Sequence, residues 1–165
     1  MKPRGIRPIF GGLDIALEAA SLLAVIVSIV LPIAFASELP DRIPIHFDET
    51  GHADRWGKSG ELYYFTGIVL VIYIMLTLLN RTPHLFNYPL KITEENAQEQ
   101  YTIAVRLLRW IKLITTVGFC AIVYRLIHNA MDGSDYLPPF WMFIFIGLLF
   151  VAIIIYFATV QKTKE

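Results

Sequence analysis

The sequence predicts an all-α membrane protein, a bundle of four transmembrane helices with both termini in the cytoplasm and an ordered extracytoplasmic loop between the first two helices. Hydrophobic residues make up 56% of the 165 residues and charged residues only 17%, whereas a soluble domain has about 25% charged residues. The apolar residues are concentrated in runs long enough to cross a bilayer. The connections between these runs are too short for a second domain, so residues 1–165 are predicted to form a single membrane domain.

The predicted boundaries follow the apolar runs. The spans are expected at about residues 14–37, 61–80, 103–128 and 139–160, with an outer loop at 38–60 and an inner connection at 81–100. The last span is apolar on all sides, which is typical of a helix that faces lipid over much of its surface.

The first span has no charged residue from Ala19 to Ala36, and a helix of that length rises about 27 Å, close to the hydrocarbon thickness of roughly 30 Å. Asp14 is predicted to be its N-cap. A cleaved signal peptide is the alternative, because the chain starts with basic residues and Ala34-Phe35-Ala36 resembles a cleavage site. The apolar run is longer than in signal peptides and two acids precede it, which favours an uncut helix.

Charged residues limit the length of the uncharged segment in the third span. The uncharged stretch between Lys112 and Arg125 is too short to cross a bilayer alone. We expect Arg125 to reach the outer interface by snorkelling, and the bases at the other end to reach the inner one. Those bases are Arg106, Arg109 and Lys112. They could also form ion pairs with Asp14 and Glu18 of the first helix, and such structural pairing is favoured over a functional role of these charges.

The distribution of lysine and arginine predicts the orientation, because these residues are enriched in cytoplasmic segments. Ten lie on the side of the termini and four on the other side. The prediction is therefore a multi-pass protein of the cytoplasmic (inner) membrane with the 38–60 loop outside. The formal net charge is zero, so a nucleic acid is not an expected partner.

The outer loop carries most of the polar chemistry. Ile43, Ile45 and Phe47 alternate with other residues, which indicates a short strand with one apolar face that caps the outer ends of the spans. A turn is predicted over 48–51, because Gly51 can adopt a positive φ, and a second turn over 54–57.

The order and spacing of several loop residues resemble a known family. They are Pro40, Pro44, His46, Phe47, Gly51, Asp54, Trp56, Gly57 and Lys58. The string is similar to the N-terminal domain of unknown function found in SdpI-type immunity proteins, an SdpI-like family of bacterial integral membrane proteins. The segment Phe86–Asn96 resembles a cytoplasmic connection of short relatives of that family. The resemblance implies immunity against a membrane-active peptide, and it implies that these loop residues bind a ligand or partner or organise the loop.

Two His-x-Asp pairs in the loop suggest different chemistry. In a strand, residues i and i+2 point to the same side, so each pair could present an imidazole and a carboxylate together. The four residues, His46, Asp48, His52 and Asp54, could then hold Zn²⁺ or a similar divalent metal. The alternative is that His46 caps or hydrogen-bonds the backbone of the loop and that the acids form turns.

Other catalytic arrangements are not evident. The single Cys120 excludes an intramolecular disulfide, and no nucleophile is paired with a base. No acid or histidine falls in the middle of a span, which argues against an ion-coupled transporter. The leading hypothesis is a non-enzymatic protein, without a cofactor, that binds a peptide, lipid or partner protein at its outer face. The alternatives are a small membrane enzyme with a metal in the 46–54 loop, and a subunit of a larger membrane complex.

Overall fold

The computed structural model describes residues 2–163 and is mostly helical. Within those residues, four helices are long and apolar enough to cross a membrane. They are α1 (Gly12–Ala34), α2 (Leu62–Leu79), α3 (Ala97–Asp132) and α4 (Phe140–Lys162). The prediction of a multi-pass membrane protein is confirmed at this level.

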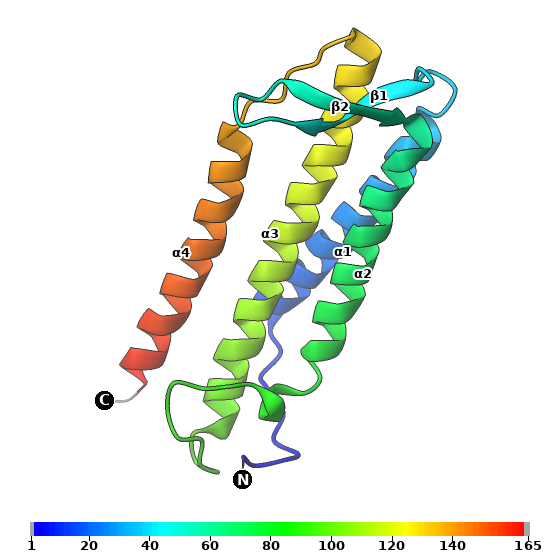
Figure 1. Cartoon of the computed structure of the whole chain (residues 1–165). Coiled ribbons are helices and arrows are strands. Elements are labelled where there is room, and N and C mark those ends of the chain that lie inside the picture. Colours follow the sequence, from blue (N-terminus) through cyan, green and yellow to red (C-terminus); the bar gives the residue numbers. More distant parts are fainter. Residues whose placement is uncertain (1, 164–165) are drawn as a thin grey trace.

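Helix α3 is the centre of the arrangement, because α1, α2 and α4 all pack against it (Figure 1). Helices α1 and α2 also contact each other, so α1, α2 and α3 form a three-helix unit. Helix α4 packs mainly against α3. Among the described residues of α4, Val160 alone is buried. This agrees with its apolar sequence on every side.

The start of α1 differs from the prediction for Asp14. The N-cap is Gly11, and Asp14 lies three residues further on, where its Oδ2 accepts a hydrogen bond from the Gly11 amide at 3.0 Å. Asp14 therefore still satisfies an unpaired amide of the first turn, although it does so from inside the helix. Helix α3 extends beyond the predicted span of 103–128 at both ends, and its C-cap is Gly133, whose φ of 68° is left-handed.

The loop between α1 and α2 is a β-hairpin, so the all-α prediction is wrong in this detail. Strand β1 (Arg42–Phe47) pairs with strand β2 (Ala53–Lys58) in an antiparallel two-stranded sheet. The apolar alternation in β1 predicted the first strand. The predicted turn over 54–57 is wrong, because these residues pair across the sheet with β1 and Trp56 lies opposite Pro44.

The two ends of the bundle are packed differently. At the hairpin end, Ile43 forms a buried cluster with Leu62 and with Val123, Leu126 and Ile127 of α3. At the opposite end, where residues 2–11 and the 80–96 connection lie, a smaller cluster contains Ile92, Ala97 and Tyr101. The connection between α2 and α3 includes a short 3₁₀ helix, η2 (Pro83–Leu85), and another, η1 (Ser59–Glu61), leads into α2. The protein thus has a hairpin end and a terminal end, with the helices between them (Figure 1).

Candidate functional site

The hairpin is held to the bundle by one face of β1. Ile43 is completely buried and packs on α3, and Pro44 is also buried. Phe47 is half-buried and packs against the same cluster. Because burying a large aliphatic side chain contributes roughly 2 kcal/mol, these contacts fix the sheet firmly on the ends of the helices. The expected apolar cap is therefore present.

The turn between the strands is organised by Asp48. Its Oδ1 accepts hydrogen bonds from the Thr50 amide at 2.8 Å, the Thr50 hydroxyl at 2.7 Å and the His52 amide at 3.0 Å. These donors, the Thr50 hydroxyl first, lower the pKa of Asp48 below its usual value. Gly51 completes the turn with a φ of 92°, which a residue with a side chain rarely adopts. The turn predicted over 48–51 is present.

The tip of the hairpin is bonded to the connection between α3 and α4. The Ala53 amide donates to the Asp135 carbonyl at 2.7 Å, and the Leu137 amide donates to the Gly51 carbonyl at 2.8 Å. The rings of His52 and Tyr136 lie 5.2 Å apart. No sequence pattern indicated this third segment, because its residues are far from the hairpin in the chain. The hairpin is therefore held in two places, by the packing of β1 on α3 and by the hydrogen bonds between its tip and the α3–α4 connection.

The histidines of the loop do not pair as the sequence suggested. His46 Nδ1 lies 2.6 Å from Asp54 Oδ1, across the sheet, and His52 Nδ1 lies 3.8 Å from Asp135 Oδ1. Asp48 is occupied by the turn instead. Within residues 2–163, no three His, Cys, Asp or Glu side chains are placed to hold a metal ion together. The structure thus does not gather the four predicted ligands into one site.

The remaining loop residues divide into those that hold the hairpin and those that face outward. Pro44, Phe47 and Gly51 belong to the first group. Pro40 is exposed in the segment before β1. The outward group is exposed and contains a bulky aromatic residue, charged residues and an imidazole; its members are His46, Asp54, Arg55, Trp56 and Lys58. Trp56 keeps 42% of its surface exposed. We call this group the hairpin face.

A second polar constellation lies near the terminal end, inside the three-helix unit. Asp14 is fully buried and accepts hydrogen bonds from Arg109 at 2.8 Å and from Arg106 at 3.0 Å. Glu18 pairs with Arg109 at 3.2 Å and also binds the ammonium of Lys112. We call these five residues the ion-pair cluster.

Lys112 is enclosed by this cluster. Its side chain is fully buried, and its Nζ bonds Thr77 of α2 at 3.0 Å and lies 4.9 Å from the ring centre of Tyr73. The expectation that Lys112 and Arg109 snorkel to the interface is wrong, because both are paired within the bundle. The prediction of ion pairs with Asp14 and Glu18 is confirmed. A buried charge without a partner would cost several kcal/mol, which explains why acids and bases from different helices meet here.

Comparisons with known proteins identify one similar domain and one similar protein, and neither match carries a described activity. A family model described as "Domain of unknown function (DUF1648)" matches residues 23–70, which run from α1 through the hairpin into α2. An uncharacterized protein from Archaeoglobus fulgidus is 29% identical over 159 residues, covering 86% of this chain and 84% of the relative. No solved structure matches the chain. The chain is therefore similar to a domain of unknown function around the hairpin, and to an uncharacterized archaeal protein along most of its length.

Proposed function

We propose that this protein is a non-enzymatic protein of a bacterial cytoplasmic membrane that binds a membrane-active peptide at its hairpin face. In this proposal the termini lie in the cytoplasm and the hairpin lies outside. Immunity against such a peptide is the specific form, and the resemblance of the loop to SdpI-type proteins supports it. The observation that carries the proposal is the exposed hairpin face, held rigidly on a buried support.

Two physical features of the hairpin support peptide binding. First, a two-stranded sheet has strand edges that an extended peptide can pair with through its backbone. Second, Trp56 and Arg55 are both exposed on β2, and aromatic and arginine side chains contribute much of the energy at binding surfaces. A rigid support reduces the conformational entropy that binding would otherwise lose.

The orientation is tested by labelling. Thr50 is exposed at the tip of the hairpin, so a cysteine placed there in a Cys120→Ala background should react with a membrane-impermeant maleimide in intact cells. A cysteine at Arg81, which is exposed at the terminal end, should react only after lysis. The reverse pattern would refute the proposed orientation.

The binding role is tested by protection. Cells that produce the protein are challenged with a panel of amphipathic membrane-active peptides, and the inhibitory concentration of each peptide is measured. We expect protection against at least one peptide and loss of protection in Trp56→Ala. The matched control is Phe157→Ala, because Phe157 is 48% exposed on α4, far from the hairpin. Absence of protection across the panel, or equal loss in both variants at equal protein levels, would count against the hairpin face as the binding site.

A further inference from the structure

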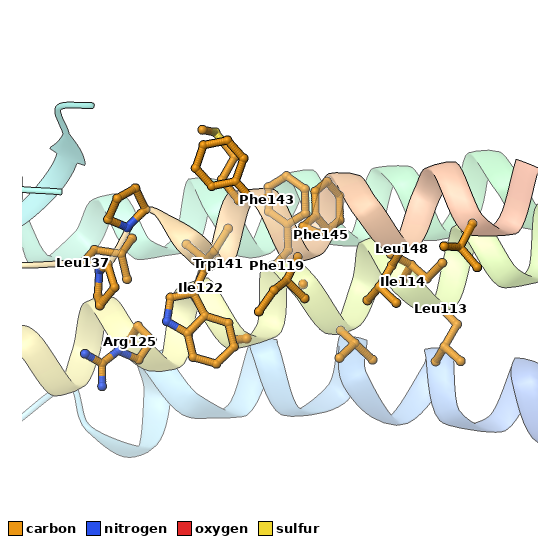
Figure 2. Close-up of a pocket in the computed structure, with 18 of the residues that line it drawn as sticks. Leu113, Ile114, Phe119, Ile122, Arg125, Leu137, Trp141, Phe143, Phe145 and Leu148 are labelled. Atoms are coloured by element: carbon orange, nitrogen blue, oxygen red, sulfur yellow. The ribbon is translucent and has the colours of Figure 1, made fainter. Parts of the chain in front are cut away.

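A long apolar groove separates α3 from α4. It has a volume of about 900 Å³, and its walls are mostly aliphatic and aromatic side chains of these two helices. Figure 2 shows Leu113, Ile114 and Leu148 toward one end of the groove and Arg125 and Leu137 at the other. The ring of Phe145 lies against Gly118, where an added Cβ would be 2.8 Å from the Phe145 Cδ2 atom. The two helices therefore make close contact through a small residue, while the groove beside them is unfilled by side chains.

The groove is long enough to hold an acyl chain. Trp110 and Arg125 line it at positions fifteen residues apart on α3, which corresponds to about 22 Å along the helix. One leaflet contributes about 15 Å of the hydrocarbon thickness. An acyl chain that starts near Arg125 can therefore lie along the groove for its whole depth in one leaflet.

The hairpin end of the groove carries charged groups of both signs. Arg125, Asp48 and Glu49 all line it. Arg125 is half-buried and its Nε is buried without a hydrogen-bond partner. Among the ion pairs formed by residues 2–163, none includes Arg125. A half-buried guanidinium without an acidic partner, at the mouth of an apolar groove, is suited to a phosphate.

We propose that this groove binds a phospholipid with an amine-bearing headgroup, of the phosphatidylethanolamine class. One acyl chain lies between α3 and α4, the phosphate binds Arg125, and the ammonium group lies toward Asp48 and Glu49. The arrangement places opposite charges together and covers the apolar surface that α4 leaves open. The proposal depends on the membrane location of the helices and is independent of peptide binding at the hairpin face.

The test uses the full-length protein in mild detergent, with lipid binding followed by native mass spectrometry. Dioleoyl phosphatidylethanolamine and dioleoyl phosphatidylglycerol are added separately; the second has the phosphate but no amine. We expect the first lipid to bind more tightly, and Arg125→Gln to weaken its binding about tenfold, the scale of one charge-assisted hydrogen bond. Glu49→Gln should reduce the preference for the amine-bearing lipid. Arg81→Gln and Glu38→Gln are matched controls, because both residues are exposed and lie outside the groove.

A second variant tests the position of the acyl chain. Ile114→Trp places a larger side chain in the apolar part of the groove, toward the end away from Arg125, and leaves the charged groups unchanged. It should release the lipid without altering the ion-pair cluster. Thermal midpoints are measured for every variant, and if Arg125→Gln does not fold, Arg125→Lys replaces it and should bind with reduced affinity.

Three results would overturn the proposal. They are equal binding of the amine-bearing lipid by wild type and Arg125→Gln, tighter binding of phosphatidylglycerol, and a lipid-free dimer that Ile114→Trp dissociates. The last result would identify a helix of a second copy as the occupant of the groove.

Discussion

The interface inside the three-helix unit and the interface between α3 and α4 differ in how they are held together. The first contains the ion-pair cluster at the terminal end and the Ile43 cluster at the hairpin end. The second consists mostly of apolar side chains around a groove, with close contact at Gly118 and one hydrogen bond from Gln100 to Thr163 at the end of α4. In a membrane, apolar surface alone gives little preference for one neighbour over lipid, whereas buried charges and close packing do. The comparison indicates that α1, α2 and α3 form a fixed unit, and that α4 packs on it with room for a lipid.

The largest effect is expected from breaking the ion-pair cluster. Asp14→Ala removes the partner of Arg106 and one of the two partners of Arg109, whose side chain is only 9% exposed. Three bases then share the single carboxylate of Glu18. Removing one partner of a buried ion pair costs about 3–5 kcal/mol, so the thermal midpoint in detergent should fall strongly.

Asp132→Ala is the matched control for this change. Asp132 also pairs with a base on α3, His128, at 2.7 Å, but its side chain is 60% exposed. An exposed pair contributes at most about 1 kcal/mol. Similar midpoints for the two variants would mean that the cluster does not hold the three helices together.

The next-largest effect compares the loss of stability when an isoleucine is truncated at the hairpin and on α4. Ile43→Ala removes a completely buried side chain, and such changes cost about 2–5 kcal/mol. Ile144→Ala makes the same chemical change on α4, at a side chain that is 49% exposed, and should change the free energy of unfolding by about 0.5 kcal/mol or less. Denaturation followed by tryptophan fluorescence measures both. Equal losses would show that α4 is packed as firmly as the hairpin.

The link between the hairpin tip and the α3–α4 connection is tested at Gly51. Gly51→Ala places a side chain at a φ of 92° and against the Leu137 carbonyl, so it should destabilise the protein by about 1–3 kcal/mol. The effect should include faster hydrogen exchange at the Leu137 amide, which donates to Gly51. Gly60→Ala is the control, because nothing lies within 4 Å of the added Cβ there and its φ is not positive. A Gly51→Ala protein with unchanged exchange at Leu137 would contradict this link.

The smallest effect concerns the protonation of Asp48. Its pKa is lowered in the folded protein, so its contribution to stability is present above the pKa of the unfolded chain, about 3.9, and is lost as the pH falls through the folded value. Thr50→Val removes the hydroxyl donor and should raise the pKa of Asp48 toward its usual value. An NMR titration of the Asp48 carboxyl carbon measures the change, with Thr93→Val as a distant control. An unchanged pKa in Thr50→Val would mean that the two backbone amides alone stabilise the charged form.

Local patterns explain which features could be predicted. The four spans, the apolar strand around Ile43 and the turn ending at Gly51 follow from hydropathy, alternation and turn chemistry within short windows. The pairing of Asp14 and Glu18 with bases of the third helix was also predictable, because charges near the membrane require partners. The prediction of a turn over residues 54–57 was wrong. Residues such as Asp54 and Gly57 are common in turns, but pairing of β2 with β1 overrides that local preference.

By itself, the sequence determined that the chain crosses a membrane several times and that an ordered segment with an apolar side lies between the first two spans. Only the tertiary structure decided the partners of His46 and His52, the bonds between the hairpin tip and residues 135–137, and the groove beside Arg125. The physical reason is distance along the chain. Hydropathy and turn preference act between neighbouring residues, whereas these contacts join residues that come together only when the helices have packed.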